Sequence, residues 1–351
     1  MIGLSSEAVH RQGGDLRGLD RDTCLDLSTC VNLYGPPPAV REVLHDLDVR
    51  RLRPHPYEAE SSFRAGYAEH LAVDPSLLVP GRGITEFIHI LTRLLPRDRI
   101  AVVTPDYTDS IRRVVNHLPP IPGEIDTVGS RLDRIATGMA RYDYVLVSNP
   151  NNPLGLHVPV AELAEVCRMN PRSTLVVDEA YVDFLEGGQR SMASTDLSNV
   201  VVLTSPNKVL GMAGVRMGAL WTRDARLRQV IADERLNWPL SFLDSAVVIA
   251  ALRDSAWVEW TRARLLDGAR VLEALLDRRF GGVVKGTPVH YRFVASEDPV
   301  RDHAELVRSG VVVRVFDGDQ AGRVPGLRVT TPTDEDLPKL IDALAMRAGG
   351  A

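Results

Sequence analysis

Short apolar runs recur along the first two thirds of the chain, and polar loops separate them from stretches with helical spacing. One such stretch places Phe87, Ile90, Leu91 and Leu94 on a single helix face. The runs that we predict to be strands are residues 77–79, 100–103, 144–147, 174–177, 200–203 and 217–221. Continuous apolar strands that alternate with helices are typical of a mostly parallel sheet covered by helices on both faces. The pattern therefore predicts an α/β fold.

The two ends of the chain have a different texture. Residues 1–38 form an irregular arm with one short predicted strand at 25–28, and we predict helices at 38–47 and 61–71. After Pro239 the pattern predicts helices at 241–252 and 255–280, strands at 289–294, 311–315 and 327–330, and a last helix from Thr333. We expect Trp257 and Trp260, on the apolar stripe of the long helix, to lie in the core.

This change of texture predicts three parts. They are an N-terminal arm (1–38), a large domain (39–240) and a smaller α+β domain (241–351). We expect the arm to pack with the smaller domain.

Polar motifs follow almost every predicted strand. In an open parallel sheet the carboxyl ends of the strands meet at one edge, and ligands bind beyond that edge. We therefore expect the motifs to share one ligand.

The stretch from Ser205 to Arg216 suggests which ligand this is. Lys208 follows the strand at 200–203, and a desolvated amine at a strand end can form a Schiff base with an aldehyde. The Ser205 hydroxyl and the forked Arg216 guanidinium are suited to a phosphate. An aldehyde and a phosphate occur together in pyridoxal 5'-phosphate (PLP). A surface loop with an exposed lysine is the alternative for this stretch alone.

Other strand ends carry groups that fit the same cofactor. Asp178 can keep the ring nitrogen protonated, Tyr181 and Asn152 can bind the phenolic oxygen, and Tyr107 can stack on the ring. The glycine loop that opens a helix at Gly83, Ile84 and Thr85 can direct its N–H groups at a phosphate. Taken singly, each group also fits an ordinary cap, turn or packing role. Their joint order along one α/β chain favours the cofactor.

Composition and charge narrow the partners. The 351 residues are 44% hydrophobic and 25% charged, as in globular proteins, and the net charge of −5 predicts no nucleic-acid surface. No run of about 18 apolar residues predicts a membrane span. Cys24, Cys30 and Cys167 lack metal-type spacing, and their odd number without a secretory signal predicts a cytoplasmic protein. We therefore expect neither a metal nor a nucleic acid nor a membrane as a partner.

The motifs together resemble the fold-type-I PLP-dependent enzymes of aminotransferase class I and II. The resemblance rests on segments 149–155, 178–181 and 205–216 and covers the chain from about Leu25 to the last predicted helix. It implies that Lys208 is the Schiff-base lysine and that Asp178 and Tyr181 act with it. The remaining cofactor contacts that it implies are Asn152, Tyr107, Gly83, Ile84, Thr85, Ser205 and Arg216.

Within this family the chain is most similar to histidinol-phosphate aminotransferases and threonine-phosphate decarboxylases. Residues 25–37 resemble the arm segment of that subgroup, and Gln12-Gly13-Gly14 is similar to the His-Gly-Gly of the decarboxylases. The likeness implies substrate contacts by Asn32 and a grip on the α-carboxylate by Arg328. Arg314 matches the position that contacts a distal phosphate, and a solvated arginine at a strand end is the alternative.

Four residues depart from the subgroup. Cys30 replaces an arm asparagine, Asn207 replaces the serine before the lysine, and His290 stands where an asparagine is expected. His55 replaces a tyrosine that reaches the phosphate of the partner subunit, which implies His55 as a cofactor contact. Because the changes lie on the substrate side, we expect an enzyme of a biosynthetic side pathway.

The sequence therefore predicts a homodimeric PLP-dependent aminotransferase that acts on an α-amino acid or an amino-phosphate. A decarboxylase of the threonine-phosphate type, or an oxidase or cyclase, is the alternative on the same scaffold, since such reactions differ in which bond is held perpendicular to the ring. A third alternative is a non-catalytic regulator, but such proteins usually carry a DNA-binding domain that the short arm lacks.

Overall fold

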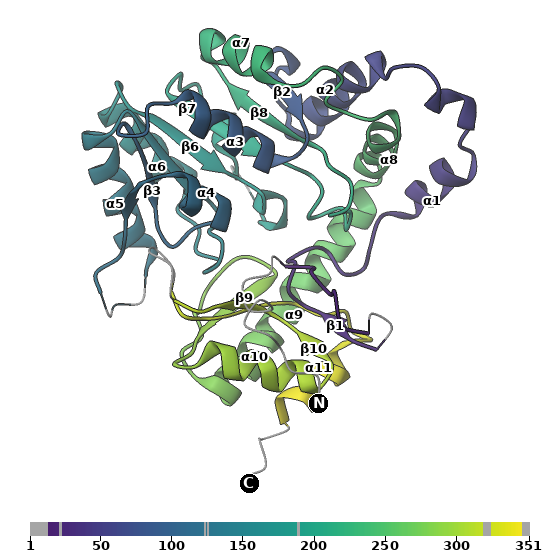
Figure 1. Cartoon of the computed structure of the whole chain (residues 1–351), viewed down its shortest axis with the longest axis vertical. Coiled ribbons are helices and arrows are strands. Elements are labelled where there is room, and N and C mark those ends of the chain that lie inside the picture. Colours follow the sequence, from purple (N-terminus) through teal and green to yellow (C-terminus); the bar gives the residue numbers. More distant parts are fainter. Residues whose placement is uncertain are drawn as a thin grey trace.

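The computed structural model of the chain describes residues 13–20, 23–122, 124, 126–187, 190–318 and 324–345. A large α/β part lies above a smaller part in Figure 1, and the long helix α9 extends from one toward the other. None of the described helices is long and apolar enough to cross a membrane.

Seven strands form the central sheet of the large part, in the order β2-β8-β7-β6-β5-β3-β4. Their bounds are β2 (Leu78–Gly81), β3 (Ile100–Val103), β4 (Asn116–Leu118), β5 (Tyr144–Ser148), β6 (Thr174–Asp178), β7 (Val200–Thr204) and β8 (Gly218–Thr222). Only β8 runs against the others, because it pairs antiparallel with both β2 and β7. The predicted α/β fold with a mostly parallel sheet is confirmed. The sequence missed β4, whose Asn-His-Leu has no apolar run and which forms by pairing with β3 at the edge.

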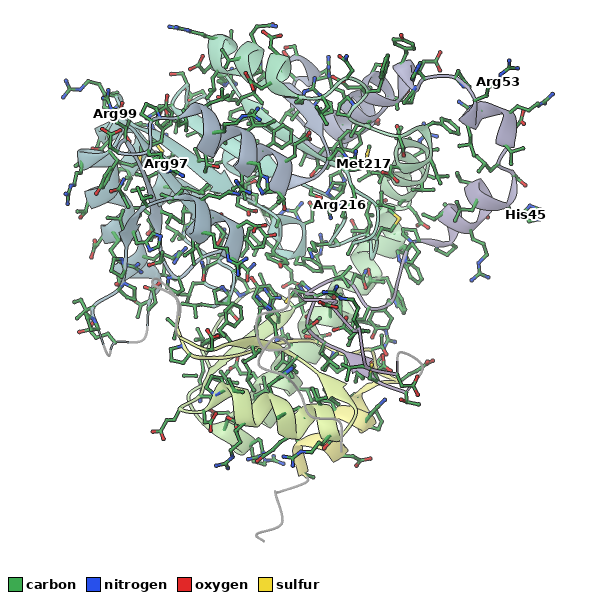
Figure 2. The ribbon with its side chains drawn as sticks, in the orientation of Figure 1. His45, Arg53, Arg97, Arg99, Arg216 and Met217 are labelled. Carbon is green, nitrogen blue, oxygen red and sulfur yellow. The ribbon has the colours of Figure 1, made fainter. Side chains whose placement is uncertain are left out.

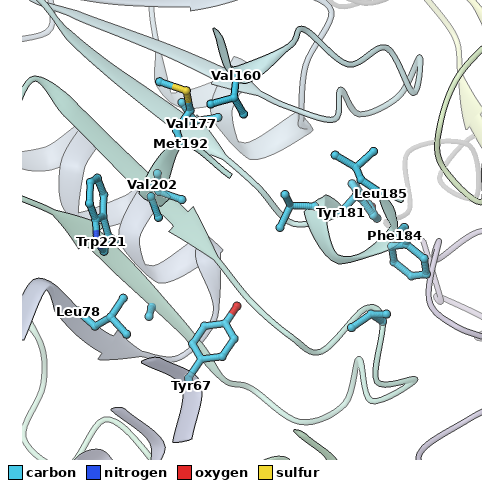
Figure 3. Packing of buried hydrophobic residues seen from close by; sticks show 14 of the residues in the cluster. Tyr67, Leu78, Val160, Val177, Tyr181, Phe184, Leu185, Met192, Val202 and Trp221 are labelled. Atoms are coloured by element: carbon cyan, nitrogen blue, oxygen red, sulfur yellow. The ribbon is translucent and has the colours of Figure 1, made fainter. Parts of the chain in front are cut away.

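Helices cover both faces of this sheet. They are α1 (Pro38–His45), α2 (Tyr57–Leu71), α3 (Ile84–Leu94), α4 (Thr108–Arg113), α5 (Val128–Arg141), α6 (Val160–Met169), α7 (Ala225–Glu234) and α8 (Phe242–Arg253). Alternate strand residues face opposite layers, as the two-residue period of a strand requires. Val177 and Val202 belong to the layer in Figure 3, whereas Val176 and Val201 belong to the layer on the other face.

A three-stranded sheet, β11-β12-β9, organises the smaller part. The elements here are β9 (Tyr291–Ala295), β10 (Val311–Val312), β11 (Arg314–Phe316), β12 (Gly326–Thr330), α9 (Ser255–Phe280), α10 (Pro299–Arg308) and α11 (Leu337–Ala345). The single strand predicted at 311–315 is wrong, because β10 pairs with β1 (Leu25–Asp26) of the arm while β11 pairs with β12. The sequence could not show that two sheets share this stretch.

One core prediction on α9 is also wrong. Trp260 is 45% exposed, and its ring packs at the surface against Tyr34 and Trp257, at centroid distances of 5.3 and 5.2 Å. Helical spacing reports which residues share a face, but it does not report how much of that face the rest of the fold covers.

Candidate active site

A cavity of about 330 Å³ lies at the carboxyl ends of the parallel strands. It brings together most of the residues that the sequence predicted: Gly83, Ile84, Thr85, Tyr107, Asn152, Asp178, Tyr181, Ser205, Lys208, Arg216, Arg314 and Arg328. The parallel strands deliver all but two of them, and Arg314 and Arg328 come from β11 and β12 of the smaller part. The cavity therefore lies between the two parts of the molecule.

Lys208 is partly buried and faces this cavity from the loop after β7. Its Nζ donates a hydrogen bond to the carbonyl oxygen of Thr29, at 3.1 Å. Burial, together with the positive charges of Arg328 and Arg216, lowers the pKa of Lys208 to about 8. A large fraction of the amine is therefore neutral near pH 8, as a nucleophile or a base requires.

Asp178 is a buried carboxyl group at the end of β6, with 5% of its surface exposed. Its Oδ1 accepts a hydrogen bond from the backbone N–H of Ala180, at 3.0 Å. Among the described residues it forms no ion pair, and burial with the nearby Asp106 raises the pKa of Asp178 to about 7. A carboxyl group in this state is suited to a cationic partner from a ligand.

Arg328 joins three separate segments at the cavity. Its Nη1 donates to Oδ1 of Asn152 at 2.5 Å, and its Nη2 donates to the carbonyl oxygen of Ser28 in the arm at 2.8 Å. The guanidinium lies 5.7 Å from the ring of Tyr291, which itself contacts Tyr181 edge-on at 5.0 Å. Arg328 is therefore held in place by neighbours from both parts of the molecule.

Arg216 and the Gly83 loop give the cavity the features of an anion site. Figure 2 shows Arg216 near the middle of the molecule, well inside the outer positions of His45 and Arg53. Gly83 has a φ of +80°, and a Cβ on it would lie 3.1 Å from Nη2 of Arg216, so glycine keeps this loop and the guanidinium together. The Ser205 hydroxyl, in contrast, donates its proton to the carbonyl oxygen of Met217, at 2.7 Å. In this arrangement the proton is not directed at an anion.

The sequence did not single out several lining residues. Thr29 reaches the cavity from the arm, and Asp109 lines it beside Tyr107. Oδ2 of Asp109 accepts a hydrogen bond from the Tyr107 hydroxyl, at 3.1 Å. Its position two residues after Tyr107 was a signal that the sequence offered.

Behind the cavity, a buried carboxylate connects two strand ends. Oδ1 of Asp106 accepts from the backbone N–H of Tyr107 at 2.7 Å. Its Oδ2 accepts from the backbone N–H and the hydroxyl of Ser148, at 2.8 and 2.9 Å, and from Nη2 of Arg131 at 2.8 Å. The Ser148 oxygen in turn accepts from the backbone N–H of Asn152, at 3.1 Å. Asp106 therefore fixes both the Tyr107 and the Asn152 segments.

Two predicted site residues lie elsewhere in this chain. Asn32 is buried, and its Nδ2 donates to the carbonyl oxygen of Val209 and to Oγ1 of Thr261, both at 2.9 Å. Its backbone N–H donates to the carbonyl oxygen of Lys208, so Asn32 supports the lysine loop instead of lining the cavity. His55 is exposed, and its ring stacks on Trp238 at 4.0 Å.

The structure shows whether Arg314 is a solvated arginine. Arg314 is 5% exposed and lines the cavity, so the alternative of a solvated arginine is wrong. Gln12 lies outside the described residues, but Gly13 next to it lines the cavity.

Two departures from the subgroup lie one layer behind the cavity. His290 is fully buried and stacks on Phe184 at 3.6 Å, with Tyr181 at 6.1 Å, and burial lowers the pKa of His290 to about 3. Cys30 is fully buried with a φ of +49°, and its backbone N–H donates to Oγ1 of Thr330 at 2.8 Å. Neither residue therefore lines the cavity itself.

The residues present fit PLP. The buried Asp178 has no cationic partner among the described residues, Lys208 supplies a partly neutral amine, and the Gly83 loop with Arg216 supplies anion-binding groups. This donor set matches a ring nitrogen, an aldehyde and a phosphate held at three separate places.

Comparisons with known proteins agree with this geometry. The family model for aminotransferase class I and II matches residues 22–344. The chain is 30% identical to histidinol-phosphate aminotransferase 1 of Bradyrhizobium diazoefficiens, over 92% of this chain and 93% of that protein. It is 28% identical to the histidinol-phosphate aminotransferase of Pseudomonas entomophila, over 91% and 92% of the two chains.

Solved structures establish the same fold. The histidinol-phosphate aminotransferase of Clostridium acetobutylicum superposes with a TM-score of 0.78 at 18% identity, covering 91% of this chain and 97% of that chain. The enzyme of Sinorhizobium meliloti in complex with pyridoxal-5'-phosphate gives 0.74 at 19% identity, covering 90% and 88%. L-threonine-O-3-phosphate decarboxylase of Porphyromonas gingivalis gives 0.75 at 18% identity, covering 91% and 97%.

Proposed function

The chain belongs to the class I and II aminotransferases, and from its cavity we propose that its substrate is a small amine with a separate anionic group. The protein is a PLP-dependent aminotransferase. When bound, PLP accepts electrons from the substrate Cα and carries the amino group from one substrate to the next. The protein supplies the binding, the orientation and the proton transfer.

We assign the cofactor contacts from the lining of the cavity. Asp178 would hold the ring nitrogen, Asn152 and Tyr181 the phenolic oxygen, and Tyr107 the ring face. The phosphate would lie at the Gly83–Thr85 segment and Arg216. Within the described residues the carboxyl group of Asp178 accepts one hydrogen bond, and its pKa is raised. Both observations support this assignment, since a cationic ring nitrogen would complete its environment.

Lys208 is the proposed nucleophile and the base at the substrate Cα. Its lowered pKa supports this role, because the neutral amine can accept the Cα proton and return it to another atom. The hydrogen bond from Nζ to the Thr29 carbonyl oxygen holds the amine at the arm side of the cavity.

Two buried arginines carry the substrate proposal. Arg314 and Arg328 are directly paired residues of β11 and β12, and both line the cavity. Directly opposite residues of an antiparallel pair have their side chains on the same face, with Cβ atoms about 4.5–5.5 Å apart. Two buried arginines on one face of the sheet are suited to a phosphate or to two carboxylates. Because the relatives are named histidinol-phosphate aminotransferases, L-histidinol phosphate is the first compound to test.

Mass spectrometry of the cofactor after one half-reaction tests this proposal. The purified holoenzyme is mixed with L-histidinol phosphate or with a panel of amino acids and amino-phosphates, without a keto acid. We expect pyridoxamine phosphate and the matching carbonyl product to accumulate with a phosphorylated or dicarboxylic substrate. Conversion only of amines that lack a second anionic group would contradict the substrate proposal.

The position of Gly13 favours a second candidate, a decarboxylase of phosphorylated amino acids. Gly13 lines the cavity, and the next residue, Gly14, donates its backbone N–H to the Ser28 hydroxyl at 2.8 Å. The arm therefore reaches the place where it can select which bond at Cα faces the ring. In the same experiment, unchanged PLP with an amine and carbon dioxide would support decarboxylation.

We further propose a homodimer with active sites shared between subunits. Exposed Tyr57 and Trp238 pack with His55 in an aromatic patch, which would be covered in a dimer. A cytoplasmic location remains a prediction from the sequence.

A further inference from the structure

A second cavity, of about 400 Å³, lies on residues that the proposed active site does not use. His157, between β5 and α6, and Arg190, after the short helix η4 (Val182–Phe184), line it from the large part. Arg270 on α9, together with Thr287 and Arg292 near β9, lines it from the smaller part. The second cavity is therefore also a junction between the two parts.

Arginines outnumber carboxylates among the residues that line the second cavity. Three arginines line it, together with one carboxylate, that of Glu186. Arg270 also pairs with Asp267 at the surface, at 2.6 Å. Arg292 is buried and oriented, because its Nε pairs with Glu273 at 2.8 Å and its Nη1 donates to the carbonyl oxygens of Val289 and Tyr291. Arg190 donates to the carbonyl oxygen of Leu185 at 2.9 Å and forms no ion pair within the described part of the chain.

Two buried polar atoms in the lining have no partner. In the regions that the structure describes, neither Nε2 of His157 nor Oγ1 of Thr287 makes a hydrogen bond. Buried polar atoms in folded proteins are almost always hydrogen-bonded to protein or to ordered water, so these two atoms are candidate contacts for a molecule bound beside them. Both atoms can donate a hydrogen bond to an anion.

We propose that the second cavity binds a phosphate monoester of small-metabolite size. The forked guanidinium groups match phosphate oxygens, and the Thr287 hydroxyl and the His157 imidazole add donors. Leu185, Leu266 and Val289 supply apolar walls for the organic part, and the volume lies within the range of small-molecule sites.

The second cavity adjoins the walls of the active site. The Tyr291 hydroxyl, one residue from Arg292, donates to the carbonyl oxygen of Asn151 at 2.6 Å. A Cβ on Gly155, in the loop after Asn152, would lie 3.0 Å from Val289 and 3.1 Å from Thr287. A bound ester would connect the segment after Tyr181 to β9, so its binding stabilises the arrangement of the two parts.

Calorimetric titration of the holoenzyme tests the proposal at constant ionic strength. The probes are glycerol 3-phosphate, inorganic phosphate and glycerol, and the variants are Arg190→Gln and Thr287→Val. The matched control is Arg278→Gln, an exposed residue of α9 that does not line the second cavity. Arg314→Gln reports binding at the active site instead.

We expect the wild-type protein to bind glycerol 3-phosphate, and both cavity variants to bind it at least tenfold more weakly. Arg278→Gln and Arg314→Gln should leave the affinity unchanged. The site would be overturned if the wild-type protein did not bind glycerol 3-phosphate, or if Arg190→Gln and Thr287→Val bound it as tightly as the wild type. Loss of binding in Arg314→Gln would also overturn it. If inorganic phosphate bound as tightly as glycerol 3-phosphate, or more tightly, the proposal that the ligand is a phosphate monoester would be overturned. The half-reaction tests the proposed function, whereas the titration tests the second cavity. A negative half-reaction would therefore leave the titration result valid.

Discussion

At the scale of single residues, the proposed site contains two ionisable groups whose charged forms are disfavoured by burial. Burial lowers the pKa of Lys208 to about 8 and raises the pKa of Asp178 to about 7. Both residues face one cavity from neighbouring strand ends, and a shift of one unit corresponds to about 1.4 kcal/mol. A bound cofactor would offset both burial costs, because its positive ring nitrogen would pair with Asp178 and its aldehyde would bind the Lys208 amine.

Lys208→Ala should reduce the rate of the transamination half-reaction by roughly 10³-fold or more, because the variant lacks the nucleophile and the base. Single-turnover absorbance measurements check this. Lys285→Ala is the control, since Lys285 is an exposed lysine paired with Asp277. A rate within tenfold of the wild-type value would exclude Lys208 from the chemistry.

Asp178→Asn should change how the stability of the cofactor-free protein depends on pH. The pKa of Asp178 is raised to about 7 in the folded state from its ordinary 3.8, so between these values the folded protein holds a proton that the unfolded chain has released. Wild-type stability should therefore fall as the pH rises from 4 to 7, by at most about 4 kcal/mol from this group.

Urea unfolding of the two proteins at pH 5 and pH 8 measures the difference. The variant should gain on the wild type at pH 8, whereas Asp133→Asn, at an exposed position of α5, should follow the wild type. Identical pH profiles for Asp178→Asn and the wild type would show that the buried carboxyl does not titrate in this range.

Arg314→Gln should lower kcat/KM for a phosphorylated substrate by roughly 10–100-fold, the cost of losing hydrogen bonds to a charged group. The same change should have little effect on the corresponding unphosphorylated amine. Steady-state kinetics measure kcat/KM for both substrates. The control is Arg308→Gln, a change at an exposed residue of α10. An equal loss with both substrates would mean that Arg314 supports the fold and does not read the phosphate.

At the scale of elements, buried ions hold the strand ends in register. Arg131 on α5 is 1% exposed and pairs with Asp106 and Asp126, at 2.8 and 3.3 Å. Asp106 holds the segments that carry Tyr107 and Asn152, so the helix behind the sheet fixes the geometry in front of it.

Arg131→Met should destabilise the protein by roughly 3–5 kcal/mol, because it leaves the buried Asp106 without its ion-pair partner, whereas Asp126 keeps its pair with Arg134. Urea unfolding of the holoenzyme reports this cost, and fluorescence titration should show weaker PLP binding. The control is Arg141→Met at the exposed end of the same helix. A loss below about 1 kcal/mol would show that the ion pairs contribute little.

At the scale of the whole molecule, the active site is formed where the two parts and the arm meet. Strand β1 of the arm pairs with β10, and Arg328 reaches Asn152 of the large part. His55 lies outside this chain's cavity, as a residue that serves a partner subunit would. This arrangement supports a dimer in which each site receives residues from both chains.

The double variant Tyr57→Ser/Trp238→Ser should sediment as a monomer and lose activity, because it removes the apolar side chains of the aromatic patch. Sedimentation velocity of the holoenzyme measures this. Trp260→Ser, an exposed tryptophan outside the patch, should remain a dimer. A fully active monomer of the wild-type protein would refute shared sites.

The α/β fold and the residues that line the cavity at the strand ends were predictable because their signals are local. Continuous apolar runs predict strands, parallel strands end at one edge, and residues such as Asp178 and Ser205 follow those ends directly. The sequence therefore determined that Lys208 and Asp178 share a site.

Other features depend on residues far apart in the chain. Asn32 was predicted to touch the substrate, but packing places it against Val209 and Thr261. Arg314 lies opposite Arg328 on neighbouring strands, and Asp106 forms an ion pair with Arg131. Neither contact has a signal in the local sequence. The sequence by itself determined the order of the elements and the chemistry at their ends. Only the tertiary structure decided which distant side chains meet and which polar atoms stay unpaired, since both depend on how the two parts pack together.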